Sequence, residues 1–239
     1  GAHILSIVNV LGSSIANASD DVLYTWAGPE IAVATTKAYS TQLSVIYLLA
    51  IKMAALLGTI TPEQTQQYIA ELSTLPDKVK QALDNKEQIQ YWASQFYNHK
   101  SIFFIGRNVD YAVALEGSLK LKEISYIHSE AYAGGELKHG TISLIEKGTL
   151  VIALGTHQAV IDKIASNIEE VKARGAVVMS IAVEGDERLE KLSDCTIFIP
   201  KTDALFQPSL TVLPLQFFAY YVASLKDCSI DKPRNLAKS

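Results

Sequence analysis

Cysteine is scarce in this sequence of 239 residues, which contains only Cys195 and Cys228. The two are not spaced as Cys-x-x-Cys, so neither a redox motif nor a zinc ribbon is indicated, and one pair cannot form a multi-disulfide framework. We therefore expect two reduced, unreactive thiols and no bound metal. The sequence also lacks a charged leader followed by an apolar stretch and a cleavage site, so the expected location is the cytoplasm.

Positive charge is not in excess either. The 21 Lys and Arg residues are outnumbered by 25 Asp and Glu residues, and no basic run is interleaved with aromatic residues. This composition argues against a nucleic-acid-binding surface. The longest apolar run, residues 45–57, contains Lys52 and is shorter than the roughly 20 residues that a membrane span needs. We expect it to form a buried helix, and we expect neither a nucleic acid nor a membrane as a partner.

With 49% hydrophobic and 19% charged residues, the chain can form one large or two ordinary globular domains. From residue 101 onward, short apolar runs alternate with helical patterns. The expected strands are 101–106, 149–155, 177–182 and 195–200, and the expected helices are 111–129, 158–174, 186–192 and 210–226. Apolar strands separated by helices are typical of a parallel sheet covered on both faces. The predicted fold class is α/β, a doubly wound, flavodoxin-like three-layer αβα domain.

The first sixty residues repeat part of this domain at a constant offset of 174 positions. Without a gap, Ser6 corresponds to Ser180 and Tyr47 to Tyr221. The order of apolar strand, polar stretch, second apolar run and long apolar helix also matches. We infer a duplication whose N-terminal copy is truncated, because counterparts of residues 101–174 would lie before the first residue. An anion-binding loop of that copy would lie there too.

A helical linker is expected between the copies. Thr61, Pro62 and Gln64 form the signature of a capped helix start. We expect Pro76 to end or kink this helix before a second one runs as far as Phe96. The predicted division is residues 1–60 as the C-terminal part of the first domain, 61–98 as the linker, 99–229 as the second domain and 230–239 as a C-terminal tail. From its sequence alone, the short, proline-broken tail is expected to fray.

The stretch from residue 116 to 140 contains the groups best suited to moving protons. Glu116, Lys120 and Glu123 are spaced i, i+4 and i+7, so on a helix they share one face. The same spacing is also typical of a solvated helix face with weak ion pairs. The apolar residues of this helix are expected to point toward a core: Leu115, Leu119, Ile124 and Ile127.

His139 is flanked by glycines on both sides, namely Gly134, Gly135 and Gly140. Glycine allows the backbone to bend and to approach a ligand closely. An imidazole also titrates near neutral pH, which suits a proton-transfer role. A structural role for this single histidine remains the alternative.

Three strings resemble one known family: LEGSLKLKEISYIHSEAYAGGELKHG, KPRNLAKS and EIAVATTKAYSTQL. They are similar to the isomerase half of the glutamine:fructose-6-phosphate amidotransferases, which is built from two sugar isomerase (SIS) domains. The resemblance covers essentially the whole chain. It implies two doubly wound SIS domains and the conversion of fructose 6-phosphate and ammonia to glucosamine 6-phosphate. No cofactor is expected.

The resemblance also implies catalytic roles, position by position. Glu123 would move a proton between C1 and C2 of the sugar, and Lys120 would assist that transfer. His139 would assist ring opening and would come from the neighbouring subunit of a homodimer. Lys238 would approach the anomeric carbon or form an imine with the open ketose, with the backbone of Ala237 beside it.

Val33 and Thr35 match family positions that contact the sugar, and Thr35 keeps the hydroxyl where the family commonly has serine. In the family, a glutaminase domain that supplies ammonia and a Ser/Thr-rich phosphate loop both precede the matched region. Two alternatives remain open. One is a phosphosugar-binding regulatory module without turnover, and the other is a simple phosphosugar isomerase that does not aminate.

Overall fold

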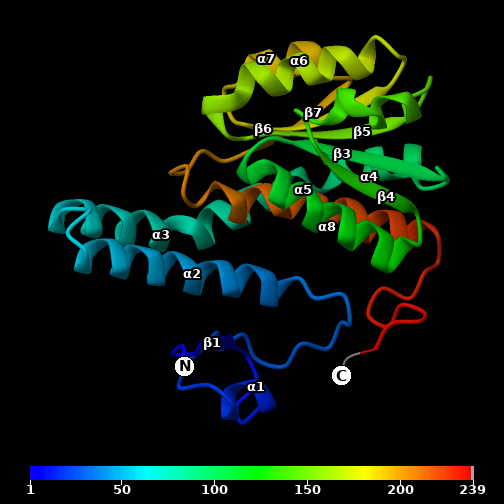
Figure 1. Cartoon of the computed structure of the whole chain (residues 1–239). Helices are drawn as coiled ribbons and strands as arrows, with labels where there is room; N and C mark the ends of the chain where they lie inside the picture. The colour runs from blue at the N-terminus through cyan, green and yellow to red at the C-terminus, as the bar shows by residue number, and fades with distance from the viewer. Residues whose placement is uncertain (238–239) are drawn as a thin grey trace.

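The computed structural model describes residues 1–237 and contains two parallel sheets with a layer of helices between them (Figure 1). The first part of the chain forms β1 (Leu5–Val8), α1 (Ser14–Asn17), β2 (Asp21–Tyr24), α2 (Lys37–Leu56), α3 (Pro62–Ala82), the 3-10 helix η1 (Leu83–Asn85) and α4 (Lys86–Phe96). The second part forms β3 (Ser101–Gly106), α5 (Val109–Ser125), β4 (His128–Ala133), η2 (Leu137–His139), η3 (Thr141–Leu144), β5 (Leu150–Gly155), η4 (Gln158–Val160), α6 (Ile161–Lys172), β6 (Val177–Val183), α7 (Glu187–Leu192), β7 (Cys195–Ile199) and α8 (Gln207–Leu225).

The larger sheet has parallel strands in the order β4-β3-β5-β6-β7. This is the strand order of flavodoxin-like folds, in which the chain winds first to one side of its opening strand and then to the other. The central strands are continuous apolar runs because helices cover both of their faces. The predicted α/β class with a doubly wound, three-layer domain is confirmed.

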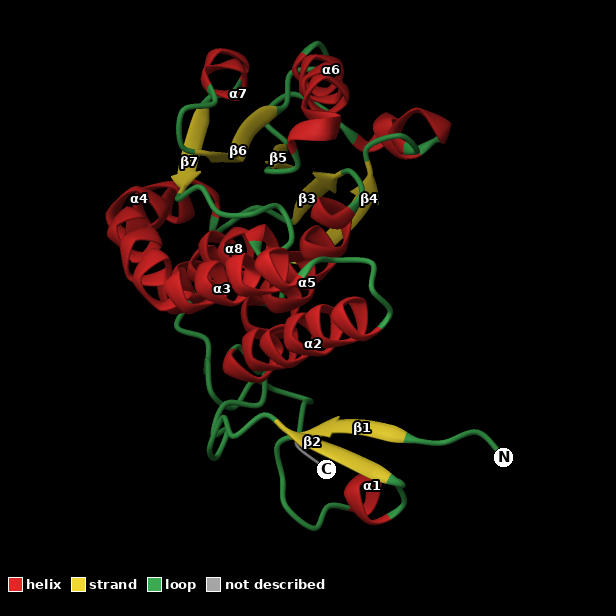
Figure 2. Ribbon diagram, turned by 90° about the vertical axis from the view of Figure 1, so that its left-hand side faces the viewer, coloured by secondary structure: helices red, strands yellow, loops and turns green. Residues whose placement is uncertain are grey.

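Successive residues of each strand alternate between two apolar clusters, as a pleated strand requires. In β3, Ile102 and Phe104 pack with residues of α4, α5 and α8, whereas Phe103 and Ile105 pack with residues of α6 and α7. Figure 2 shows the resulting layers, with α6 and α7 on one side of the sheet and α4, α5 and α8 on the other. The helix α2 lies beyond α8, farther from the sheet.

The strands β1 and β2 form a separate parallel pair whose register repeats that of β6 and β7. Leu5 is aligned with Asp21, and the residues 174 positions later, Met179 and Cys195, are aligned with each other. The order β1-α1-β2-α2 likewise corresponds to β6-α7-β7-α8. Because a shift of one residue would turn every side chain to the other face, the shared register strengthens the inference of a duplication.

The edge strand β4 was not predicted, since residues up to 129 were expected to continue the preceding helix. Instead α5 ends at Ser125, and Tyr126 closes it in a left-handed conformation with φ 62°. Glycine usually occupies this position after a helix, so a tyrosine gave no signal that the helix ends. The six residues of β4 then pair with β3 along its whole length.

The helix α3 does not end at Pro76, contrary to one of the two expectations for that residue. It continues to Ala82. Proline removes one helical hydrogen bond and crowds the preceding turn, but the neighbouring Leu75 is buried in the main core and anchors the helix there. The start of α3 is confirmed, because Thr61 and Gln64 exchange the side-chain and backbone hydrogen bonds of a capping box.

The helix α2 was expected to be buried, and this prediction is wrong for most of its length. Tyr47 is 5% exposed, whereas Leu56 is 72% exposed. The Tyr47 hydroxyl lies 3.1 Å from that of Ser209, and its ring meets Phe206 edge-on. By length and composition alone α2 could cross a membrane. In this fold one side of α2 packs against α3 and the start of α8. The opposite side of α2 is also apolar, and residues 1–237 do not cover it.

The close approach of β3 and α5 yields a prediction about stability. A Cβ atom added at Gly106 would lie 2.5 Å from the backbone carbon of Asp110. Because backbone atoms cannot move aside cheaply, we expect Gly106→Ala to lower the free energy of unfolding by about 2 kcal/mol or more. In the control Gly135→Ala, the new atom would first meet the Arg107 guanidinium at 3.3 Å, and we expect a change below about 0.5 kcal/mol. Urea denaturation followed by circular dichroism measures both, and equal effects would contradict the prediction.

Candidate functional site

Three charged side chains meet on one face of α5, as their spacing predicted. The Nζ atom of Lys120 lies 2.6 Å from a carboxylate oxygen of Glu123 and 3.7 Å from one of Glu116. The Lys120 side chain is 5% exposed, and those of Glu116 and Glu123 are 13% and 22% exposed. The alternative of a solvated helix face is therefore wrong. These groups form a partly buried cluster of one ammonium and two carboxylates.

The apolar residues of α5 divide between two environments. Ile124 is buried as predicted, and so is Ile127 just after the helix, but Leu115 and Leu119 are 47% and 41% exposed. The side of α5 that faces the core is the one that contains Gly117, where α8 approaches so closely that an added Cβ would meet a leucine side chain. Leu115 and Leu119 each lie two residues from Gly117. Two residues correspond to slightly more than half a turn of an α-helix, so both leucines lie on the opposite side of α5.

Burial determines how charge is shared within the cluster. Burial raises the pKa of Glu116 above its ordinary value, Lys120 partly offsets this rise, and the nearby Glu123 carboxylate adds to it. The short hydrogen bond of Lys120 goes to Glu123, and a charge-assisted bond of this kind fixes the orientation of the carboxylate. Glu123 is also the more exposed of the two acids. It is therefore the carboxylate that a ligand can reach.

Tyr39, in the first turn of α2, lies close to this cluster. Burial raises the pKa of Tyr39 to about 12, and the negative charge of Glu116 contributes to the rise. The phenol is therefore neutral at physiological pH. This electrostatic interaction links α2, from the first copy, to α5, from the second.

The C-terminal tail is held by hydrogen bonds, contrary to the expectation that it frays. The amide of Val33, in the loop before α2, donates a 2.9 Å hydrogen bond to the carbonyl of Asp231. Further along, the amide of Arg234 donates to the Tyr126 hydroxyl at 2.8 Å, and the Arg234 guanidinium lies 4.1 Å from the centroid of the same ring. Because Tyr126 directly follows α5, the tail passes from the loop before α2 to the end of α5 that carries Glu123 (Figure 1).

The residues predicted to contact the sugar lie along this path. Val33 contacts the tail directly, and the Thr35 hydroxyl donates a 2.6 Å hydrogen bond to the Glu30 carboxylate. Ala237 is exposed at the end of the tail, and Lys238 lies outside the described residues. The structure thus gathers Val33, the tail and the end of α5 in one region.

His139 is exposed in η2, beyond the carboxyl end of β4. Glu123 lies in the last turn of α5, shortly before β4 begins. The length of β4 separates the two positions, and six residues of a strand span about 20 Å. A single chain therefore does not bring His139 to Glu123.

The cysteines lie outside this region. Burial raises the pKa of the Cys195 thiol to about 12, so it remains a thiol, and Cys228 is also free. The burial of Cys195 supports the prediction of an unreactive thiol. Within residues 1–237, no group of three or more His, Cys, Asp or Glu side chains is arranged to hold a metal ion.

Tyr39, Tyr126 and Arg234 belong to this region although no sequence pattern predicted them there. Tyr126 directly follows the helix with the charged face, and Arg234 is a cation in the tail, but neither position indicates a ring–guanidinium contact across the fold. Tyr39 becomes part of the cluster only when α2 packs beside α5.

Comparison with known proteins gives consistent matches. The SIS domain family matches residues 1–52 and 95–226. Over its whole length the chain is 58% identical to the glutamine–fructose-6-phosphate aminotransferase (isomerizing) of Caldanaerobacter subterraneus and 55% identical to that of Clostridium acetobutylicum. The chain spans 39% of the length of each of these relatives.

Solved structures share the fold. The C-terminal domain of glucosamine-fructose-6-phosphate aminotransferase from Francisella tularensis matches with a TM-score of 0.91 and 35% identity, over 96% of this chain and 65% of that one. Glucosamine-6-phosphate deaminase from Thermotoga maritima matches with a TM-score of 0.74 and 27% identity, over 98% of this chain and 66% of that one.

The contacts of the tail can be tested through its mobility. Tyr126→Phe removes the hydrogen bond to the Arg234 amide but keeps the ring beneath the guanidinium. Since such a bond contributes about 1 kcal/mol, we expect amide hydrogen exchange in residues 231–237 to become about fivefold faster. The control Tyr220→Phe changes a 47% exposed tyrosine on α8 and should leave this exchange unchanged. Mass spectrometry measures both, and an unchanged rate in Tyr126→Phe would show that the hydroxyl does not hold the tail.

Proposed function

The chain belongs to the SIS domain family, and on that premise we propose that it carries out the isomerase reaction of glucosamine 6-phosphate synthesis, a step of amino-sugar biosynthesis. In this reaction fructose 6-phosphate and ammonia give glucosamine 6-phosphate and water. The observation that carries the proposal is the buried Lys120 between Glu116 and Glu123, on the helix whose C-terminal end contacts the tail through Tyr126. The identity with isomerizing aminotransferases supports the same reaction.

The chemistry requires a proton to move between adjacent carbons. Ammonia adds to the C2 carbonyl of the open-chain sugar, and loss of water leaves an imine. Removal of a proton from C1 and delivery of a proton to C2 then give the 2-amino aldose. One carboxylate held near both carbons can accept the first proton and return it, and Glu123 is the accessible carboxylate of the cluster.

Lys120 and Glu116 support this base in different ways. Lys120 lies at hydrogen-bond distance from Glu123, so it orients the carboxylate and assists proton transfer. Glu116 serves as the second counterion of the buried ammonium, because a buried charge needs compensation. Its proposed role is therefore structural.

The sugar is proposed to lie between the loop before α2 and the tail. Val33 and Thr35 would contact it from the loop, and the backbone of Ala237 from the tail. Lys238 would approach the anomeric carbon or form an imine with the open ketose, since a lysine can form a Schiff base with a carbonyl carbon. The contacts of Val33 with Asp231 and of Tyr126 with Arg234 support this arrangement, because they hold the tail between the loop before α2 and the end of α5 that carries Glu123.

His139 is proposed to act from the neighbouring subunit of a homodimer. Its position at the opposite edge of the sheet from Glu123 supports this arrangement, since ring opening needs a proton-transfer group near the sugar. In the full-length protein, a glutaminase domain would supply the ammonia. We further propose that this protein works in the cytoplasm, without a cofactor.

We expect Glu123→Gln in the full-length protein to lower kcat by about 10²- to 10⁴-fold, because an amide cannot accept the proton. Fructose 6-phosphate binding should be nearly unchanged, because the amide keeps the shape of the carboxylate. The matched control Glu116→Gln, on the same helix face, should lower kcat by less than about tenfold. Steady-state assays of amino-sugar formation and calorimetric binding measure these effects. Near-normal turnover in Glu123→Gln would favour a different base or a binding module without turnover.

A mixing experiment tests whether His139 crosses between subunits. Glu123→Gln and His139→Asn are each expected to be inactive alone. If the subunits are exchanged at equal amounts, half of the dimers are mixed and each regains one intact site, which gives roughly one quarter of wild-type activity. Activity that does not rise on mixing, while mass spectrometry detects mixed dimers, would place His139 and Glu123 in the same subunit's site.

A further inference from the structure

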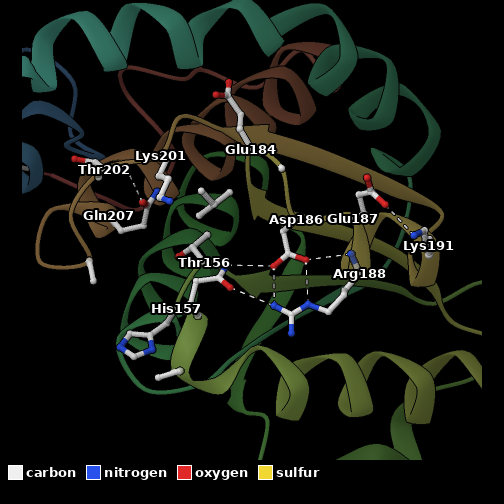
Figure 3. Close-up of a pocket in the computed structure, with 15 residues that line it drawn as sticks. Thr156, His157, Glu184, Asp186, Glu187, Arg188, Lys191, Lys201, Thr202 and Gln207 are labelled. Atoms are coloured by element: carbon white, nitrogen blue, oxygen red, sulfur yellow. Dashed lines mark hydrogen bonds and ion pairs between the residues drawn. The ribbon is translucent and has the colours of Figure 1, made fainter.

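A cavity lies at the carboxyl ends of β5, β6 and β7, the opposite edge of the sheet from Glu123 (Figure 3). Its volume is ≈ 780 Å³, within the range of pockets that hold small molecules. Polar side chains contribute much of its wall, including Thr156, His157, Asp186, Arg188, Lys201 and Gln207. In open α/β sheets, ligands bind at this edge.

The internal repeat relates this cavity to the proposed sugar site. The offset of 174 positions that reproduces the register of β1 and β2 in β6 and β7 also pairs Val33 with Gln207. Val33 is a proposed sugar contact, and Gln207 lines the cavity. The cavity is therefore the counterpart, in the second copy, of the site proposed for the first.

Unused polar groups in the wall suit an anionic ligand. Lys201 is exposed and, among the described residues, contacts no carboxylate. The Nδ1 atom of His157 is buried and has no hydrogen-bond partner within residues 1–237. Arg188 lines another part of the cavity, where its guanidinium already donates hydrogen bonds to Asp162 at 2.8 Å, to Gln158 at 3.2 Å and to Asp186 at 3.3 Å.

A fixed network forms the rest of this wall. Asp186 accepts hydrogen bonds from Gln158 at 3.1 Å and from Arg188 at 3.3 Å. Burial acts to raise the pKa of Asp186, but these hydrogen bonds outweigh burial and hold the pKa below its ordinary value. Asp186 therefore stays ionised and keeps Gln158 and Arg188 in place. A preorganised set of donors and acceptors of this kind loses little entropy when it binds hydroxyl groups.

The turn after β5 does not provide the anion contact. The amides of Thr156 and His157 donate to the buried carboxylate of Asp110 at 2.7 and 3.1 Å. Because the chain's own carboxylate already uses these donors, an anion in the cavity must be held by side chains. Lys201 is the exposed cation available for this purpose, because the Arg188 guanidinium is bound to Asp162, Gln158 and Asp186.

We propose that this cavity is a second, non-catalytic binding site for a phosphorylated sugar. The phosphate lies against Lys201, and the sugar hydroxyls lie against Asp186 and Gln207. The choice of a phosphorylated sugar rests on the proposed function, because it is inferred from the duplicated substrate site.

The test uses the full-length protein with Glu123→Gln, which prevents turnover, and titrates it calorimetrically with fructose 6-phosphate. We expect two binding sites per chain. Adding Lys201→Glu should weaken one of them at least tenfold and leave the other unchanged. The control Lys80→Glu makes the same charge change at a 78% exposed lysine on α3 and should preserve both sites. Inorganic phosphate should bind the second site at least tenfold more weakly than the sugar phosphate does.

Other outcomes separate this proposal from the proposed function. One site per chain that is unaffected by Lys201→Glu overturns the second site and leaves the catalytic proposal standing. Equal affinity for inorganic phosphate and fructose 6-phosphate at the Lys201-dependent site overturns the recognition of the sugar. The catalytic proposal is judged separately, by the turnover of Glu123→Gln.

Discussion

The need to cover a parallel sheet on both faces determines where chemistry can occur in this fold. Each strand is followed by a crossover that returns the chain to the edge where the strand began. The helix α5 therefore starts at the carboxyl edge of the sheet and ends at the amino edge, so Glu123 lies far from the edge where open α/β sheets bind ligands. The proposed base is consequently served by the tail and by the loop before α2. The carboxyl edge of the same sheet is left to a separate cavity.

The central sheet could be predicted because buried parallel strands are short, apolar and separated by helices. The charged face of α5 could be predicted because helix geometry converts a spacing of three or four residues into a position. The edge strand β4 could not, because a tyrosine ends the preceding helix where glycine is usual. The exposure of α2 and the contacts of Tyr39 and Arg234 depend on which elements pack together, and no local pattern encodes that information.

The two copies share their strand register but differ in what they contribute. The second copy supplies α5 with its carboxylates and continues into the tail, whereas the first supplies Val33, Thr35 and Tyr39. At the carboxyl edge of the second copy, the Asp110 carboxylate accepts hydrogen bonds from the backbone amides of the turn after β5. A buried carboxylate in this place stabilises the turn from within the fold, which leaves the surrounding side chains free to diverge.

The hydrogen bond between the Val33 amide and the Asp231 carbonyl joins segments from nearly opposite ends of the chain. Contacts of such long sequence separation form late, because a large loop must close before they provide any stabilisation. During synthesis, the loop before α2 emerges from the ribosome long before the segment it pairs with, and the second sheet can fold in the interval. The assembled region around Glu123 is therefore absent from any nascent chain that ends before Asp231.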